Sequence, residues 1–270
     1  MSGKNYEETL IIGDVREFLH WLQDNEALFT ESLHASQPER QAWLKSIRQT
    51  PYYDRPDNRG SDEVPIHPAR VVTELRQAAP RDTVLVVDSG AHSYHVPHYW
   101  TAYAPNEFLI LTNTGPMGYG VSVAIGAKLA QSEQPCVVIA GDGSLLMHGM
   151  EIKTAVRYNI PLIVVVINNS ALGNIYLRAT ETGKEWPENA IEASKIPTLD
   201  CVSFARSLGA DGILVEHPDQ LATAFTKAFI EIDAHAKPFI VDVRCCRDCR
   251  VPNDAYSAAE GAASSLTLAR

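Results

Sequence analysis

Two apolar runs that each end in small polar residues constrain the fold of this chain more than any other feature. The first run, Val137 to Ala140, is followed by Gly141-Asp142-Gly143-Ser144, and the second, Leu162 to Ile167, is followed by Asn168-Asn169. Short continuous apolar runs are typical of parallel strands that are buried on both faces. The 23 residues 145 to 167 between the two polar clusters leave room for one helix and the second strand.

This order of elements places both polar clusters at one edge of the predicted sheet. Residues 149 to 158 suit a helix that returns the chain, so the two strands run in the same direction. Ligands of open α/β sheets bind at the carboxyl ends of the strands. Mg²⁺ takes one or two carboxylates together with phosphate oxygens, so Asp142, an asparagine amide and a backbone carbonyl predict a site for Mg²⁺ and a cofactor diphosphate. Gly-Asp-Gly alone is a common turn, and Asn-Asn after a strand is a common start of a loop. It is their occurrence together at this spacing that favours a cofactor site.

The same alternation of apolar runs and helical patterns extends along most of the chain. It predicts an α/β fold, a doubly wound, mostly parallel sheet with helices on both faces. The predicted strands are Val84 to Val87, Phe108 to Leu111, Cys136 to Ala140, Leu162 to Ile167, Ile213 to Val215 and Phe239 to Val243. The predicted helices are Pro68 to Ala79, Tyr119 to Gln131, Met150 to Tyr158, Leu199 to Leu208 and Asp219 to Ala234.

The chain is expected to comprise four segments. Residues 1–49 read as a strand end near Leu10 to Asp14 and two helices, too little for a core of their own. Residues 50–64, with prolines and a glycine among charges, read as a linker. Residues 65–243 form the α/β domain, and residues 244–270 form an Ala- and Ser-rich tail that is either disordered or folds over the site.

Composition excludes several classes of protein. The 270 residues are 45% hydrophobic, enough for a sizeable core. A net charge of -10 argues against a nucleic-acid partner, so an anionic cofactor needs local dipoles and a metal. No apolar stretch is long enough to span a membrane and the first residues lack a signal-peptide pattern, so the cytoplasm is expected.

The five cysteines divide into two groups. Cys136 and Cys201 fall in a predicted strand and a predicted helix and read as core residues. Cys246 and Cys249 have C-x-x-C spacing, with Cys245 adjacent. A zinc site needs further ligands and a second C-x-x-C is missing, so we expect a reduced, exposed thiol cluster, with a metal or redox role as the alternative.

Several motifs together resemble a known enzyme group. The span from about Leu10 to Val243 resembles the C-terminal part of the thiamine-diphosphate enzymes of the acetolactate synthase, pyruvate oxidase and 2-oxo acid decarboxylase group. The motifs that carry the resemblance are Asp88-Ser89-Gly90-Ala91-His92, Thr114-Gly115-Pro116-Met117-Gly118, Gly141-Asp142-Gly143-Ser144 and Asn168-Asn169. Residues 11–21 resemble the end of that group's middle domain. The implied fold is the thiamine-diphosphate-binding fold with a short remnant of a middle domain.

The resemblance implies roles for particular residues. Asp142, the side chain of Asn169 and the carbonyl of Ala171 would bind Mg²⁺. Gly115 would accept a hydrogen bond from the aminopyrimidine, and Met117 would hold the cofactor bent, which makes proton removal from the thiazolium intramolecular. The implied cofactor contacts are Ser89, Gly90, Ala91, His92, Gly115, Met117, Gly141, Gly143, Ser144, Leu172 and Gly173.

Some of these residues allow other interpretations. Ala91 stands where acetolactate synthases usually carry glutamine, which removes one phosphate-side hydrogen bond. Met117 also fits a core position. His92, His95 and His98 have a spacing that suggests a metal, but a loop near a helix start need not bring three ligands together. We favour one phosphate contact, with a substrate contact as a further role. Gly118 and Gly120 match the first two glycines of a dinucleotide-binding motif, but Val123 stands where the third glycine belongs. The evidence for such a motif is therefore weak.

The resemblance also implies a partner. In that group the activating glutamate lies in a pyrimidine-binding domain, which is not evident in these 270 residues. We therefore expect a two-component enzyme, a heterotetramer or larger, in which a separately encoded subunit supplies the glutamate. Acetolactate-synthase-like carboligation is the first choice of reaction; a 2-oxo acid decarboxylase and a 2-hydroxyacyl-CoA lyase come next. A non-catalytic regulatory or scaffold subunit is the alternative of another class.

Overall fold

The computed structural model describes residues 12–49, 57–180, 186–187 and 189–251. The chain divides between Asp54 and Arg55 into two compact units. The division falls inside the segment expected to be a linker. Residues 57–64 of that segment pack on the second unit, where the Asn58 amide lies 3.0 Å from the His67 ring and Arg70 reaches the carbonyl of Ser61.

Within residues 12–49, the described part of the first unit, lie three helices, α1 (Val15–Asp24), α2 (Ala27–Ala35) and α3 (Gln37–Gln49). The Asp14 side chain caps α1 by accepting a hydrogen bond from the Arg16 N–H, a common way of satisfying the first turn. The two helices expected within residues 1–49 correspond to α1 and α3. The expected strand end begins at Leu10 and Ile11, which lie outside the described residues.

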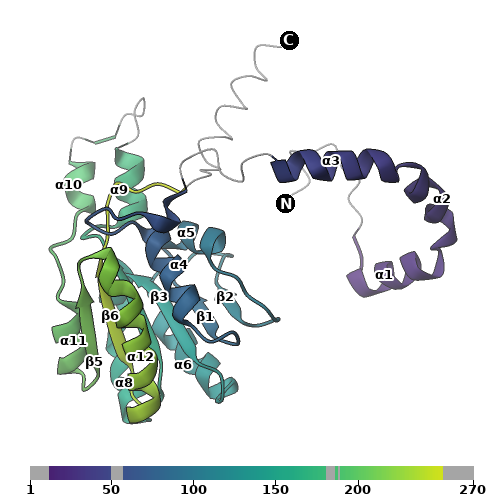
Figure 1. The fold of residues 1–270 in the computed structure, drawn as a ribbon. Helices are drawn as coiled ribbons and strands as arrows, with labels where there is room; N and C mark the ends of the chain where they lie inside the picture. The colour runs from purple at the N-terminus through teal and green to yellow at the C-terminus, as the bar shows by residue number, and fades with distance from the viewer. Residues whose placement is uncertain (1–11, 50–56, 181–185, 188, 252–270) are drawn as a thin grey trace. The chain divides into compact units, whose positions relative to one another are not determined.

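The second unit contains a six-stranded sheet in the order β2-β1-β3-β4-β6-β5, and every pairing is parallel. Figure 1 shows the strands side by side with helices packed around them. The predicted doubly wound sheet is confirmed, with all strands parallel rather than most of them. The strands are β1 (Val84–Val87), β2 (Phe108–Ile110), β3 (Cys136–Gly141), β4 (Ile163–Asn168), β5 (Asp211–Val215) and β6 (Phe239–Arg244).

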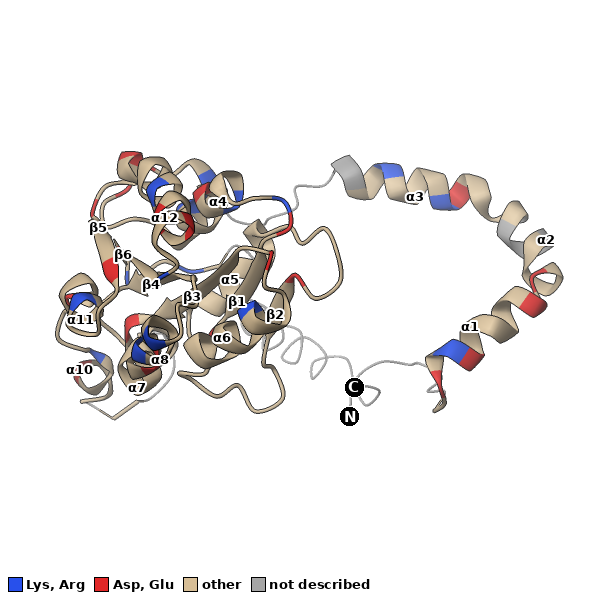
Figure 2. Ribbon diagram, turned by 90° about the horizontal axis from the view of Figure 1, so that it is seen from below, with Lys and Arg blue, Asp and Glu red and all other residues tan. Residues whose placement is uncertain are grey.

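Both faces of the sheet are buried, which explains the continuous apolar runs. Side chains alternate between faces along each strand. Val84, Val138 and Val164 therefore join one core with helices on their side, while α4 (Pro68–Ala78) and α12 (Leu221–His235) cover the other face. Figure 2 shows these two helix layers above and below the sheet. The remaining helices of this unit are α5 (His92–Tyr99), α6 (Gly120–Ala130), α7 (Asp142–His148), α8 (Ile152–Arg157), α9 (Gly173–Ala179), α10 (Ala190–Ser194) and α11 (Cys201–Ser207).

The structure adds to the helix predictions at two places near the polar clusters. The predicted helix Met150 to Tyr158 is divided into a 3₁₀ turn, Gly149–Glu151, and α8, and it is preceded by α7, which starts at Asp142 itself. The His-x-x-His-x-x-His series, expected on a loop, forms α5. In both cases glycines next to the helix start suggested a turn, and packing against the sheet decided for a helix.

The expectation of a reduced, exposed thiol cluster at the end of β6 was wrong. Cys246 and Cys249 form a disulfide with a Cα–Cα distance of 5.6 Å, within the range that a disulfide spans. Cys245, which directly follows β6, is a free thiol but is buried. The chain after β6 turns back on itself, which brings the two C-x-x-C sulfurs together. Cys136 and Cys201 are buried and free, as predicted.

Positive and negative side chains are mixed over the surface of the described residues. Figure 2 shows Lys and Arg interspersed with Asp and Glu over the helices. No helix in the described part of the chain is long and apolar enough to cross a membrane.

Candidate functional site

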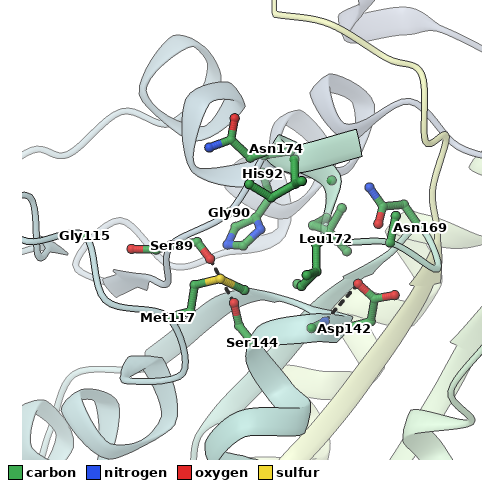
Figure 3. A pocket seen from close by; sticks show the side chains of 17 residues that line it. Ser89, Gly90, His92, Gly115, Met117, Asp142, Ser144, Asn169, Leu172 and Asn174 are labelled. Carbon is green, nitrogen blue, oxygen red and sulfur yellow. Dashed lines mark hydrogen bonds between the residues drawn. The ribbon is translucent and has the colours of Figure 1, made fainter. Parts of the chain in front are cut away.

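A pocket of about 160 Å³ lies at the carboxyl edge of the sheet, where β1, β3 and β4 end. It brings together segments that are far apart in the sequence, and Figure 3 shows their side chains converging on one space. All fourteen residues predicted to bind metal or cofactor line this pocket. They are Ser89, Gly90, Ala91, His92, Gly115, Met117, Gly141, Asp142, Gly143, Ser144, Asn169, Ala171, Leu172 and Gly173. Three further residues complete the lining: Ile167, and Asn174 and Ile175 from the segment after Asn169 that is expected to contact substrate.

Asp142 carries the principal charge at this pocket. Its carboxylate is 1% exposed, and one oxygen, Oδ1, accepts a hydrogen bond from the Gly143 N–H at 3.0 Å. The other oxygen, Oδ2, is buried and has no hydrogen-bond partner among the described residues. Burial raises the pKa of Asp142 to about 6, although nearby backbone N–H groups of Gly143, Ser170 and Ala171 partly oppose the rise. A buried carboxylate oxygen without a partner is costly unless a cation binds there.

The other predicted metal ligands lie beside Asp142. Figure 3 shows the side chains of Asn169 and Asp142 at the same corner of the pocket. Ser170, between Asn169 and Ala171, has a positive φ of 55°, so the chain turns sharply there. A carboxylate, an amide oxygen and a carbonyl form an oxygen set of the kind that Mg²⁺ prefers. No group of three or more His, Cys, Asp or Glu side chains in the described ranges is arranged to hold a metal.

Glycines keep the pocket open. A Cβ added at Gly173 would lie 2.8 Å from the Asn169 amide nitrogen and 3.0 Å from the Ala91 side chain. A Cβ at Gly143 would meet Leu172 at 2.9 Å. Because any larger residue would fill the space between these groups, the glycines allow a ligand to approach the backbone closely.

Asp88 holds two sides of the pocket together, a role that the sequence motif did not indicate. One carboxylate oxygen accepts the N–H of Gly118 at 2.9 Å, and the other accepts the N–H of Gly120 at 2.9 Å. The loop that carries Gly115 and Met117 is thereby tied to the end of β1. The only signal for this role in the sequence was an Asp that directly follows a predicted strand and precedes a glycine-rich loop by thirty residues.

His92 and Ser144 are engaged by the protein itself. The ring of His92 is hydrogen-bonded through Nε2 to the carbonyl of Asp88 at 2.8 Å, and burial lowers its pKa to about 4, so it is neutral. The Ser144 hydroxyl donates to the carbonyl of Ser89 at 2.8 Å and joins the ends of β1 and β3. Ser144 therefore has its backbone N–H, rather than its hydroxyl hydrogen, to offer a phosphate.

Met117 points into the pocket. Its side chain is half-buried, and its terminal carbon lies 3.7 Å from a Cβ placed on Gly143. The alternative interpretation of Met117 as a core residue therefore does not hold. Gly115, two residues earlier, has a φ of 56° and is exposed, so its backbone is free to face a ligand.

The three histidines of the series do not converge. On α5, His92 lies in the pocket, whereas His95 is buried against His67 with ring centroids 5.6 Å apart. Burial lowers the pKa of His95 to about 3. The series thus supplies one pocket residue and one packing residue.

Comparison with known proteins agrees with this geometry. The family model described as "Thiamine pyrophosphate enzyme, C-terminal TPP binding domain" matches residues 88–243, more than half of the chain. The chain belongs to the thiamine pyrophosphate (thiamine diphosphate) enzyme family, and the matched part is its cofactor-binding domain.

Two curated relatives and one solved structure are similar to this chain. A thiamine pyrophosphate-containing protein of Bacillus subtilis is 33% identical over 199 residues, which cover 73% of this chain and 33% of that protein. The large subunit of acetolactate synthase isozyme 3 of Escherichia coli is 29% identical over 85% of this chain and 39% of that subunit. The solved structure of a thiamine diphosphate-dependent 4-hydroxybenzoylformate decarboxylase of Rhodococcus jostii has the same fold, with a TM-score of 0.60 and 23% identity over 76% of this chain and 36% of that one. The chain spans about a third of the length of the curated relatives it matches.

Proposed function

We propose that this pocket binds thiamine diphosphate through Mg²⁺, which Asp142, the Asn169 side chain and the Ala171 carbonyl would hold. The observation that carries the proposal is the partnerless, buried Oδ2 of Asp142 beside Asn169, in a pocket kept open by glycines. Membership of the family supports the choice of cofactor.

The chain's own residues would bind the cofactor in three ways. Backbone N–H groups near Gly90, Gly143 and Ser144 would hold the diphosphate, because glycines allow this close approach. Met117 would separate the two rings of the cofactor, and the Gly115 carbonyl would accept a hydrogen bond from the aminopyrimidine. When bound, thiamine diphosphate supplies a nucleophilic carbon for making or breaking a bond next to a carbonyl.

We further propose that a pyrimidine-binding domain on a separately encoded partner completes the site and contributes the activating glutamate. The pocket of about 160 Å³ is smaller than the roughly 300–1,000 Å³ common for small-molecule sites. This domain alone therefore encloses only part of such a cofactor. The proposed assembly is a heterotetramer or larger, with the site between domains.

The reaction proposed is acetolactate-synthase-like carboligation of a 2-oxo acid. The relatives named acetolactate synthase support it, since one is aligned over 85% of this chain. Arg178, in the α9 segment after the metal-binding loop, would be a candidate contact for the substrate carboxylate. Decarboxylation and 2-hydroxyacyl-CoA cleavage use the same cofactor chemistry and are the alternatives to screen.

Calorimetric titration of thiamine diphosphate tests the proposal. Binding is expected in the presence of Mg²⁺, and not in its absence or with Asp142→Ala. The titration is done on the chain alone and on its mixture with a candidate pyrimidine-domain partner, followed by a screen of 2-oxo acids on the mixture. If no mixture binds the cofactor, a scaffold or regulatory subunit becomes the better description.

A further inference from the structure

The disulfide loop at the end of β6 touches both sides of the candidate cofactor pocket. We call residues 246–249, from Cys246 to Cys249, the cysteine loop. Arg247 lies inside the loop closed by the disulfide, and its guanidinium donates to the carbonyl of Asn169 through Nε at 3.0 Å and to the carbonyl of Ser170 through NH2 at 3.2 Å. Asn169 and Ser170 begin the turn that carries the predicted metal ligands.

The same loop is anchored on the opposite side. The backbone of Cys249 lies close enough to the His95 ring to oppose in part the lowering of its pKa by burial. His95 is on α5, the helix that starts at His92 in the pocket. At its start, the Cys246 N–H donates to the carbonyl of Ile66 at 2.9 Å. The cysteine loop thus joins α5 to the turn after β4, two parts of the pocket wall that are far apart in the sequence.

The turn after β4 needs such support. Ser170 has a φ of 55°, a left-handed conformation that costs a residue with a side chain free energy unless its surroundings hold it. Its carbonyl is fixed by two donors, Arg247 and the Ile196 N–H at 2.9 Å. The planar fork of an arginine can hold two successive carbonyls at once, which a single point charge does less well.

We propose that Arg247 is a positioning residue for the metal-binding turn, and that the Cys246–Cys249 disulfide keeps it in place, so that reduction of the disulfide loosens the turn and weakens Mg²⁺-dependent cofactor binding. This inference rests on the proposed function. Reduction by a dithiol transfers two electrons and two protons: the S–S bond breaks, two thiols form on the chain, and the dithiol becomes a disulfide. The buried neighbour Cys245, whose thiol pKa burial raises well above its usual value, is a poor attacking group and leaves the pair as the responsive unit.

Hydrogen exchange of the full chain without cofactor tests the positioning directly. Arg247→Gln is expected to raise exchange at residues 169–172 by about tenfold, and reduction of the wild type with dithiothreitol is expected to act in the same direction. Arg247→Lys should fall between Arg247→Gln and wild type. The matched control is Arg206→Gln, which removes a surface ion pair with Asp211 and should leave residues 169–172 unchanged.

A cysteine double variant isolates the disulfide. Cys246→Ser with Cys249→Ser should resemble the reduced wild type and should no longer respond to dithiothreitol. Unchanged exchange at residues 169–172 on reduction of the wild type would refute the role of the disulfide, and unchanged exchange in Arg247→Gln would refute that of the arginine. Mass spectrometry of alkylated thiols reports the redox state in each sample.

Metal affinity supplies the second readout. With thiamine diphosphate at saturation, Arg247→Gln is expected to weaken Mg²⁺ binding by about tenfold or more, as loss of a group supporting metal ligands commonly does. Tighter Mg²⁺ binding would mean that the arginine acts mainly by charge repulsion, and would overturn the proposal. If the wild type binds no cofactor at all, the proposed function fails, whereas the exchange experiment still decides whether Arg247 and the disulfide position the turn.

Discussion

The ends of β3 and β6 each place an aspartate at the carboxyl edge of the sheet, and the protein treats the two carboxylates differently. Asp242 is fully buried, yet both of its oxygens have partners: Oδ1 accepts from the Asn168 amide at 2.9 Å, and Oδ2 accepts from the Cys201 N–H at 3.2 Å and lies 3.3 Å from the Arg244 guanidinium. Asp142 is as deeply buried, but its Oδ2 has no partner in the described part of the chain.

The difference separates a structural carboxylate from a functional one. Burial raises the pKa of both groups, but at Asp242 the Asn168 amide and the Arg244 guanidinium work against the rise. At Asp142 only backbone N–H groups oppose the rise, and its pKa increases to about 6. Perturbed carboxylates that face a pocket are typical of functional sites. Asp242 thus organises the edge of the sheet, while Asp142 is left with one oxygen for a cation.

The largest expected effect is the loss of folding stability when the Asp242 carboxylate is removed. Asp242→Ala leaves the Arg244 guanidinium and the Asn168 amide without their carboxylate, and loss of one partner of a buried pair costs about 3–5 kcal/mol. Urea unfolding of the metal-free protein measures it. Asp211→Ala, which removes a surface ion pair with Arg206, is the matched control and should cost about 1 kcal/mol or less. Equal losses in the two variants would show that Asp242 is not structural.

A smaller effect is expected at Asp142, and its sign is reversed. A rise in pKa from 3.8 to about 6 means that the folded state holds the proton more tightly than the unfolded state. Ionisation of Asp142 therefore lowers stability between about pH 4 and pH 6, by about 2–3 kcal/mol in full at pH 7. Because His92 and Asp242 also have shifted pKa values, only the difference between wild type and Asp142→Asn isolates this group.

Unfolding of metal-free wild type and Asp142→Asn from pH 4 to pH 7 checks this. The wild type should lose stability relative to the variant as the pH rises. Addition of Mg²⁺ and thiamine diphosphate should restore the stability of the wild type but should not stabilise Asp142→Asn. A difference that does not change with pH would mean that Asp142 is better solvated than its burial indicates.

The smallest expected effects sharpen the role of the glycines around Asp142. Gly173→Ala places a Cβ 2.8 Å from the Asn169 amide nitrogen, so the amide must move, and we expect Mg²⁺-dependent cofactor binding to weaken by about tenfold, or 1.4 kcal/mol. Gly126→Ala on α6 meets nothing within 4 Å and should stabilise the helix by about 0.5–1 kcal/mol. Calorimetry and thermal unfolding measure the pair. Equal binding by both variants would show that the pocket wall is free to move.

Much of this arrangement was predictable because it depends on local patterns. The apolar runs of β3 and β4 are long enough and uniform enough to specify buried parallel strands, and Asp142 and Asn169 follow them directly. The other members of the pocket were named by the resemblance to the thiamine-diphosphate enzymes. The helix α7 and the disulfide were not predictable in the same way, since Gly-Asp-Gly also suits a turn and C-x-x-C also suits free thiols.

The sequence by itself determined the sheet and its parallel direction, because apolar runs and the alternation of strands with helices are local properties. Its resemblance to the thiamine-diphosphate enzymes named the residues that line the pocket. Only the tertiary structure decided which polar groups are already satisfied. Asp88, Asp142 and Asp242 each lie at or near the end of an apolar run, and their partners come from segments up to 74 residues away in the chain. A buried carboxylate acquires its role from the donors that folding brings to it, and at Asp142 folding leaves one oxygen without a donor.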